Sequence, residues 1–434
     1  MEEIPDYPIA TDDSQQGHFK KFVIKEMLDK VGFGFGSQQF INILLFLSGA
    51  SIFFVGVVNG LKSLLIILFG IFAQQYNKLK GISKKIIGIS GIFFGFSFLF
   101  MAAGNFLNSP WVFSIALLLS GMLAVLYGNF SQNFFLFGRR KEILEKIAKY
   151  GLMVTAISLF LAAYFLDNYG DGTSLSLNFF GNILLLKLPG YIIIFEVAAI
   201  AFIVSGYFLA SVKDQAAAKT GTFSLSSFAD ELNQKFHSIF KKKFLTILLL
   251  FNIIVGLIQV LGNSYYGIFI YNNFRYSYFG GFLNVAVIFL VGVFSSLIGY
   301  FITKINVKSY GMIFMLAVGS VFLSAMPFAY YLGSSLAFLT AGTILGVIGA
   351  SALGVSTSMF VIETLDEGDR EYYYIFNGIF SLIPYAILIP VFSYIAQVYS
   401  LATLFWFLGA MLMTSIILVL IFYGFMKKQM YWNN

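Results

Sequence analysis

The chain has 434 residues, of which 59% are hydrophobic and only 11% are charged. A typical soluble domain carries about 25% charged residues, so this chain cannot cover itself with a surface that water accepts. It contains no cysteine, which excludes disulfides and thiolate chemistry, and its two histidines, His18 and His237, argue against a histidine-rich metal site. Apolar runs of about 20 residues recur, each long enough to cross a bilayer. The composition therefore predicts an all-α, polytopic membrane protein.

The first 32 residues lack the pattern of a secretory signal peptide, because they are acidic and then amphipathic. We expect residues 1–32 to form a cytosolic segment. Beyond it, charges, prolines and glycines punctuate twelve predicted spans. These spans lie at about 33–50, 52–74, 86–104, 111–135, 150–167, 190–212, 244–269, 279–303, 310–331, 335–362, 374–397 and 401–425.

Basic residues gather on one side of the predicted spans. If both termini and the even-to-odd loops share a side, that side holds all but three of the 27 Lys and Arg residues, the exceptions being Lys62, Lys187 and Arg275. The positive-inside rule places this side in the cytoplasm, so both termini are expected to be cytosolic in the plasma membrane. The net charge of +7 then follows from topology, and no nucleic-acid partner is expected.

The longest cytoplasmic segment, residues 213–243, separates the predicted halves 33–212 and 244–425, and residues 426–434 form a cytosolic tail. Within it, FADELNQKFHSIF has the pattern of an amphipathic helix that lies on the membrane surface. A solvated linker is the alternative interpretation.

The two halves contain similar stretches. GIFAQQYNKLKGISKKIIGISGIF, around the second loop, matches GYFITKINVKSYGMIFMLAVGSVF, around the eighth. At these residues the chain resembles the major facilitator superfamily, over roughly residues 33–425. The resemblance implies two pseudo-symmetric six-helix bundles, related as a parallel repeat, that move a small solute by alternating access.

The loop after the second span departs from the pattern of the superfamily. Gln74 stands where an aspartate is typical, although other positions match, namely Gly70, Ala73, Gly81, Lys84 and Lys85. The fifth span lacks the glycine-proline signature of many drug antiporters, and sugar-porter signatures are absent. A proton-coupled drug exporter is therefore less favoured, and the motifs name no substrate.

Lys62 lies in the middle of the second span, ten residues beyond Ile52, or about 15 Å into the bilayer. A lysine at that depth costs about 2.5 to 3.5 kcal/mol on insertion scales, so it should face a polar cavity or a partner. Asn59 shares its face. We expect both to contribute to substrate binding. The alternative is a structural role for Lys62, either in a buried pair with Glu196 or through backbone carbonyls.

Further polar residues interrupt apolar spans. Asn252, Gln259 and Asn263 form one stripe on the seventh span, which we expect to line the cavity. Glu196 lies about 9 Å inside the sixth span, where a structural role is the stronger expectation. If Glu196 is functional, a desolvated carboxylate that titrates would couple transport to protons.

Two cytoplasmic loops at equivalent places in the halves carry opposite charges. The loop after the fourth span is basic at Arg139, Arg140 and Lys141, and the loop after the tenth is acidic at Asp366, Glu367 and Asp369. The resemblance predicts that they form a cytoplasmic gate in the outward-facing state. The alternative is that each loop merely solvates its own helix ends.

We therefore expect a monomeric secondary transporter for an anionic or zwitterionic organic solute, without a cofactor or metal. One alternative is a lipid-linked saccharide flippase of another twelve-helix fold. A second is a polytopic enzyme acting on a lipid-linked substrate, which would need clustered carboxylates or a metal. The outer loops offer only Asp167, Asp171, Lys187 and Arg275, and no ATP-binding P-loop motif is present.

Overall fold

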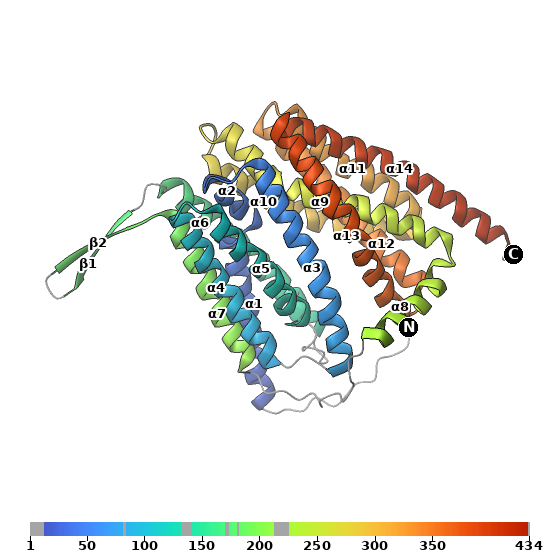
Figure 1. Ribbon diagram of the computed structural model, residues 1–434, viewed down its shortest axis with the longest axis horizontal. Coiled ribbons are helices and arrows are strands. Elements are labelled where there is room, and N and C mark those ends of the chain that lie inside the picture. The colour runs from blue at the N-terminus through green and yellow to red at the C-terminus, as the bar shows by residue number, and fades with distance from the viewer. Residues whose placement is uncertain are drawn as a thin grey trace. The chain divides into compact units, whose positions relative to one another are not determined.

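The computed structural model describes residues 13–80, 84–131, 140–169, 173–179, 182–211 and 225–432 (Figure 1). The helices preceding the linker are α1 (Asp13–Phe35), α2 (Gln38–Leu47), α3 (Ile52–Lys80), α4 (Lys84–Phe106), α5 (Pro110–Ser131), α6 (Arg140–Asn168) and α7 (Gly190–Ala210). Those that follow are α8 (Leu225–Phe240), α9 (Lys243–Phe274), α10 (Gly281–Tyr310), α11 (Met312–Leu332), α12 (Leu336–Thr364), α13 (Glu367–Val398) and α14 (Leu401–Trp432).

Eleven of the described helices are long and apolar enough to cross a membrane. They are α3 to α7 and α9 to α14, and they correspond to the second to twelfth predicted spans. The chain is thus a multi-pass membrane protein, and the all-α prediction is confirmed apart from one short hairpin.

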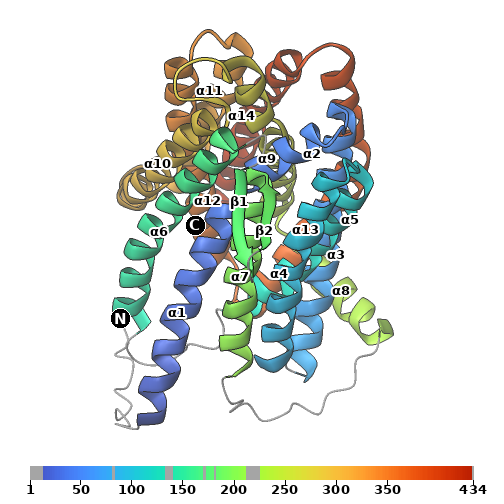
Figure 2. The same ribbon diagram turned by 90° about the vertical axis from the view of Figure 1, so that its left-hand side faces the viewer.

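The bounds predicted for the first span, 33–50, are wrong. A helix starts at Asp13, breaks at Gly36 and Ser37, and resumes as α2, which ends at Leu47. The prediction took charged residues as marks of a helix end, yet Lys25 and Asp29 are only 2% and 5% exposed within α1. The expected cytosolic segment 1–32 therefore includes a helix that packs against α6 and α7 (Figure 2).

The chain divides into two compact units. Unit 1 comprises Met1–Gly49 and Phe72–Thr222, and unit 2 comprises Ala50–Ile71 and Phe223–Asn434. The boundary passes through α3, so the first part of this helix packs with unit 2.

The two units repeat one pattern of helix pairing. In unit 1, α1 packs against α6 and α7, and α4 packs against α5 and α7. In unit 2, α9 packs against α13 and α14, and α11 packs against α12 and α14. These are the first, third, fourth, fifth and sixth helices of each predicted half, paired in the same way. This is the parallel repeat that the sequence predicted.

Small residues let the paired helices approach closely. A Cβ on Gly206 of α7 would lie 2.6 Å from the carbonyl oxygen of Gly88 on α4. On α12, an added Cβ would meet Ala329 at Gly342 and Met326 at Gly346. Such close contacts at small residues are the usual means of helix association in lipid.

A β-hairpin connects α6 to α7. Strands β1 (Thr173–Phe179) and β2 (Asn182–Leu188) pair antiparallel, with Thr173 opposite Leu188 and Phe179 opposite Asn182. In Figure 1 the hairpin extends away from the ends of α6 and α7. The sequence pattern predicts only an outer loop for this stretch.

The amphipathic helix α8 packs on protein. The rings of Phe236 and Phe240 each lie 5.5 Å from that of Phe376 on α13, and Lys235 pairs with Asp369 of α13 at 2.7 Å. Its apolar residue Ile239 is only 1% exposed. The apolar face of α8 thus packs against α13, a contact that the sequence pattern does not predict. The membrane-surface position of this helix stays a prediction.

The contact between α11 and α12 yields a matched pair of substitutions on one helix. A Cβ at Gly349 would strike the backbone nitrogen of Leu323 and lie 2.6 Å from the carbonyl oxygen of Gly319, whereas a Cβ at Gly354 would meet nothing within 4 Å. We expect Gly349→Ala to destabilise the protein by about 1 to 3 kcal/mol, because helix backbones must move apart. Gly354→Ala should be neutral or stabilising, since alanine favours helix.

Thermal unfolding of the two purified variants in the same detergent measures the difference. Equal midpoints for Gly349→Ala and Gly354→Ala would contradict the close packing of α11 on α12.

Candidate functional site

The first part of α3 is held by hydrogen bonds to two helices of unit 2. The hydroxyl of Tyr265 on α9 donates to the carbonyl of Ile52 at 3.2 Å, and the amide of Phe53 donates to Oε1 of Gln397 on α13, also at 3.2 Å. Both bonds lie at the start of α3. This end of the helix is therefore fixed to α9 and α13 by polar contacts.

Two glycines bring α3 close to the same helices. A Cβ on Gly56 would collide with the hydroxyls of Tyr265 and Ser393, and one on Gly60 would lie 2.8 Å from Ile389. The face of α3 that carries Gly56 and Gly60 thus packs against α9 and α13.

Lys62 lies on another face of α3. It follows Gly60 by two residues, which is about 200° around the helix, so its side chain leaves α3 away from the Gly60 contact with α13. The residue is half-buried. Asn59 is 6% exposed and donates to the carbonyl of Val55 at 3.0 Å, so at least part of its hydrogen bonding is local to α3.

The predicted polar stripe on α9 has two environments. Asn252 is half-buried, and its Nδ2 lies 3.4 Å from the hydroxyl of Tyr373 on α13. Gln259 and Asn263 are exposed, although Ile258 and Leu261 beside them are 2% and 0% exposed. Four residues apart, these two amides share one face of an otherwise apolar helix.

Glu196 is exposed on α7 and belongs to unit 1, whereas Lys62 belongs to unit 2. Neither its predicted coupling role nor the alternative pair with Lys62 is tested by the structure. Both stay predictions.

The acidic side of the predicted cytoplasmic gate lies at the start of α13. Asp366 and Glu367 are exposed, and Asp369 pairs with Lys235 of α8. Acidic residues in a first turn also suit the helix dipole, as the alternative interpretation requires. On the basic side, Arg139 lies outside the described residues, as do the side chains of Arg140 and Lys141.

Unit 1 contains a buried charged cluster that the sequence pattern does not predict, because Lys25 is there only one of the basic residues of the N-terminal segment. Lys25 Nζ lies 2.8 Å from Asp29 Oδ2 and 2.7 Å from Glu26 Oε1. The hydroxyls of Tyr127 on α5 and Ser205 on α7 donate to Asp29 Oδ1 at 2.7 and 2.6 Å. The four-residue spacing of Lys25 and Asp29 is the one signal in the sequence that points to this pair.

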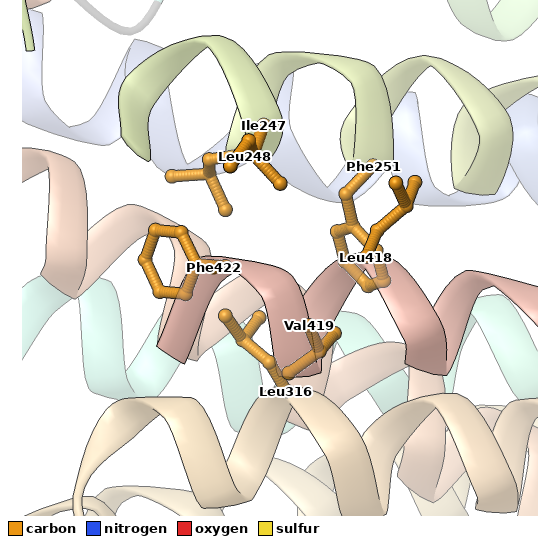
Figure 3. Close-up of a pocket in the computed structure, with 7 residues that line it drawn as sticks. All are labelled: Ile247, Leu248, Phe251, Leu316, Leu418, Val419 and Phe422. Carbon is orange, nitrogen blue, oxygen red and sulfur yellow. The ribbon is translucent and has the colours of Figure 1, made fainter. Parts of the chain in front are cut away.

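Unit 2 contains a small cavity between α9, α11 and α14 (Figure 3). Its volume is about 10 Å³, and it is lined only by apolar side chains, namely Ile247, Leu248, Phe251, Leu316, Leu418, Val419 and Phe422. It is too small and too apolar to hold a solute. Within the described part of the chain, no three His, Asp or Glu side chains gather where they could hold a metal ion.

No known family model and no curated protein matches the sequence. Solved structures do match. A mutant of the nucleoside transporter NupG has a TM-score of 0.72 at 13% identity, covering 94% of this chain and 99% of that one. A bacterial homologue of the iron transporter ferroportin, in an inward-facing state, scores 0.68 at 13% identity, covering 94% and 98%. The xylose transporter XylE from E. coli scores 0.58 at 11% identity, covering 94% and 99%. With its repeated units, the chain has the fold of the major facilitator superfamily.

Proposed function

We propose that the protein is a secondary active transporter that moves a small organic solute by alternating access. The observation that carries this proposal is the exposed pair Gln259 and Asn263 on the membrane helix α9. Lipid cannot satisfy amide groups, so a face that exposes two of them within an apolar helix is suited to water or a polar solute. The fold comparison supports the same reading.

The residues favour an anionic or zwitterionic substrate. The solved relatives are named for nucleosides, iron and xylose, so the fold does not select a substrate. Lys62 supplies a cation at mid-membrane depth, and Asn59, Asn252, Gln259 and Asn263 supply neutral hydrogen-bonding groups. A lysine ammonium and neutral amides are groups that suit a carboxylate or phosphate group. We further propose a monomer in the plasma membrane with both termini cytosolic.

The first part of α3 supplies a gate for alternating access. Its hydrogen bonds from Tyr265 and to Gln397 lie at the end of α3 that the charge distribution assigns to the outside. Because α3 continues into unit 1, a movement of the two units must either bend this helix or break those bonds. We propose that they break when the outer side opens.

Neither alternative gains support. The fold comparison removes a flippase built on a different twelve-helix fold. A membrane enzyme would need carboxylates grouped in a site or a metal, and among the described residues no three His, Asp or Glu side chains gather where they could hold a metal ion.

Lys62→Gln tests the site. We expect this variant to fold and insert normally but to lose transport at least tenfold, because the substrate anion loses its counter-charge. Uptake across a solute panel in proteoliposomes is the measurement. Arg275→Gln is the matched control, since Arg275 lies over the ring of the exposed Tyr276 and should not affect uptake.

Wild-type uptake by the Lys62→Gln variant would remove Lys62 from the site. A Lys62→Gln variant that regains stability only together with Glu196→Gln would instead establish a structural pair between these residues.

The cytoplasmic gate yields a second test. Reversing Asp366, Glu367 and Asp369 to lysine should favour the inward-facing state, because the basic loop at 139–141 would then be repelled. Reversing Arg139, Arg140 and Lys141 as well should restore the original balance. Exposed pairs contribute about 0 to 1 kcal/mol each, so several must act together. Distances between spin labels on the cytoplasmic loops, attached at cysteines introduced into this cysteine-free chain, report the change.

Lys235→Ala is the control, since it removes only the partner of Asp369 within unit 2. Unchanged distance distributions in the triple reversal would rule out the gate.

A further inference from the structure

The charged cluster of unit 1 lies where three helices meet, and unit 2 has the equivalent junction. Lys25 and Asp29 lie on α1, Tyr127 on α5 and Ser205 on α7, which are the first, fourth and sixth helices of their half. In unit 2 the first, fourth and sixth helices are α9, α12 and α14. Tyr127 lies 17 residues after the first residue of α5 and Phe360 lies 24 residues after that of α12, so the two junctions join equivalent helices at different heights along them.

The equivalent junction in unit 2 is apolar. The ring of Phe360 on α12 lies 5.7 Å from Phe244 on α9 and 5.0 Å from Phe422 on α14, and the last two rings are 6.2 Å apart. These three phenylalanines are 5%, 6% and 2% exposed. In unit 2, the equivalent three helices therefore meet through phenylalanine rings.

This comparison argues that the charges of unit 1 are not required for folding. Replacing a buried ion pair with well-packed apolar residues is often neutral or stabilising, because removing two charges from water is costly. Because equivalent helices of unit 2 pack through phenylalanines, the charges of unit 1 are candidates for a function other than packing.

When all three side chains are ionised, the cluster carries a net negative charge. Lys25 Nζ contacts both Glu26 and Asp29, so a single ammonium faces two carboxylates. The side chains of Lys25 and Asp29 are 3% and 7% exposed, whereas that of Glu26 is 18% exposed. Two carboxylates that share a dry site cannot easily both stay ionised, and Glu26 gives water access to the site.

The neighbouring helices add no other charge that faces the cluster among the described side chains. α5 contributes the Tyr127 hydroxyl, and its ring lies 5.0 Å from Lys25 Nζ. α7 contributes the hydroxyl of Ser205, which donates to Asp29. Ser211, directly after α7, accepts a hydrogen bond from Lys21. α6 meets α1 at Gly151, which faces the stem of Lys30, and at Ser158. α4 meets α1 through Phe94, whose ring lies 6.4 Å from that of Phe33. The side chains of 140–149 lie outside the description.

We propose that Lys25, Glu26 and Asp29 form a proton-binding site that takes up one proton through Glu26. The proton converts one carboxylate to a neutral acid and leaves the ammonium with a single ionised partner, so the buried cluster becomes neutral. On the transport function proposed above, the occupancy of this site sets the pH dependence of transport.

Infrared spectroscopy tests the site without any substrate, because a protonated carboxyl group has its own C=O stretching band. The wild-type protein should gain this band as the pH is lowered. Asp29→Asn and Glu26→Gln should each abolish it, since either change leaves one carboxylate for one ammonium. Lys25→Met should make the band appear at a higher pH. Asp230→Asn, at an exposed carboxylate of α8, should leave the band in place.

A band that persists in both Asp29→Asn and Glu26→Gln would overturn the proposal, as would its absence from the folded wild-type protein. A fivefold variant, Lys25→Met, Glu26→Gln, Asp29→Leu, Tyr127→Phe and Ser205→Ala, tests the comparison with unit 2. It should fold with an unchanged or raised thermal midpoint and lack the band. If it does not fold, the charges are structural and the argument fails.

Uptake into proteoliposomes at several pH values tests the link to transport. We expect Asp29→Asn to lose the pH dependence of wild-type uptake. A retained pH dependence would overturn the link between this site and transport. If no solute is transported at all, the proposed function fails, while the infrared result still decides whether the proton site exists.

Discussion

The structure depends on the absence of water from the hydrocarbon core of a membrane, which forces polar groups to find partners inside the protein. Hydroxyls obey this rule locally. Ser264, Ser320 and Ser393 each donate to the carbonyl four residues earlier, at 2.7 to 2.9 Å. Asn284 donates at 2.8 and 2.9 Å to carbonyls near the end of α9. Amides that are exposed on an apolar membrane helix, such as those of Gln259 and Asn263, therefore stand out as candidates for function.

The same constraint explains how the helices associate. Between apolar helices in lipid there is little hydrophobic driving force, so close contact of backbones must supply it. Glycines meet this need in both units, at the contact of α4 with α7 and at that of α11 with α12. The shared pairing pattern fixes the architecture, while the side chains at equivalent junctions are free to differ. The charged junction of α1, α5 and α7 and the aromatic junction of α9, α12 and α14 are the clearest case.

Helix α3 joins several features of the proposed mechanism. Its first part packs with unit 2 and its last part with unit 1. Gly56 and Gly60 face α9 and α13, while Lys62 leaves the helix on another face. A movement that separates α3 from α9 and α13 would thus also move the cation that we assign to the substrate. Opening of a gate and access to the binding charge are then linked through one rigid helix.

The sequence by itself determined the membrane class and the membrane helices from α3 onward, because span length is a local property. It also predicted the parallel repeat, through the similar stretches in the two halves. It also selected Lys62 and the α9 amides, since an interruption of an apolar run is visible in one dimension. Tertiary structure alone decided the rest. Lys25 and Asp29 looked like solvated charges until Tyr127 and Ser205, far along the chain, supplied their partners. The contact between the apolar face of α8 and α13 has the same cause. Burial depends on which residues from distant parts of the chain pack nearby, and no local pattern in the sequence contains that information.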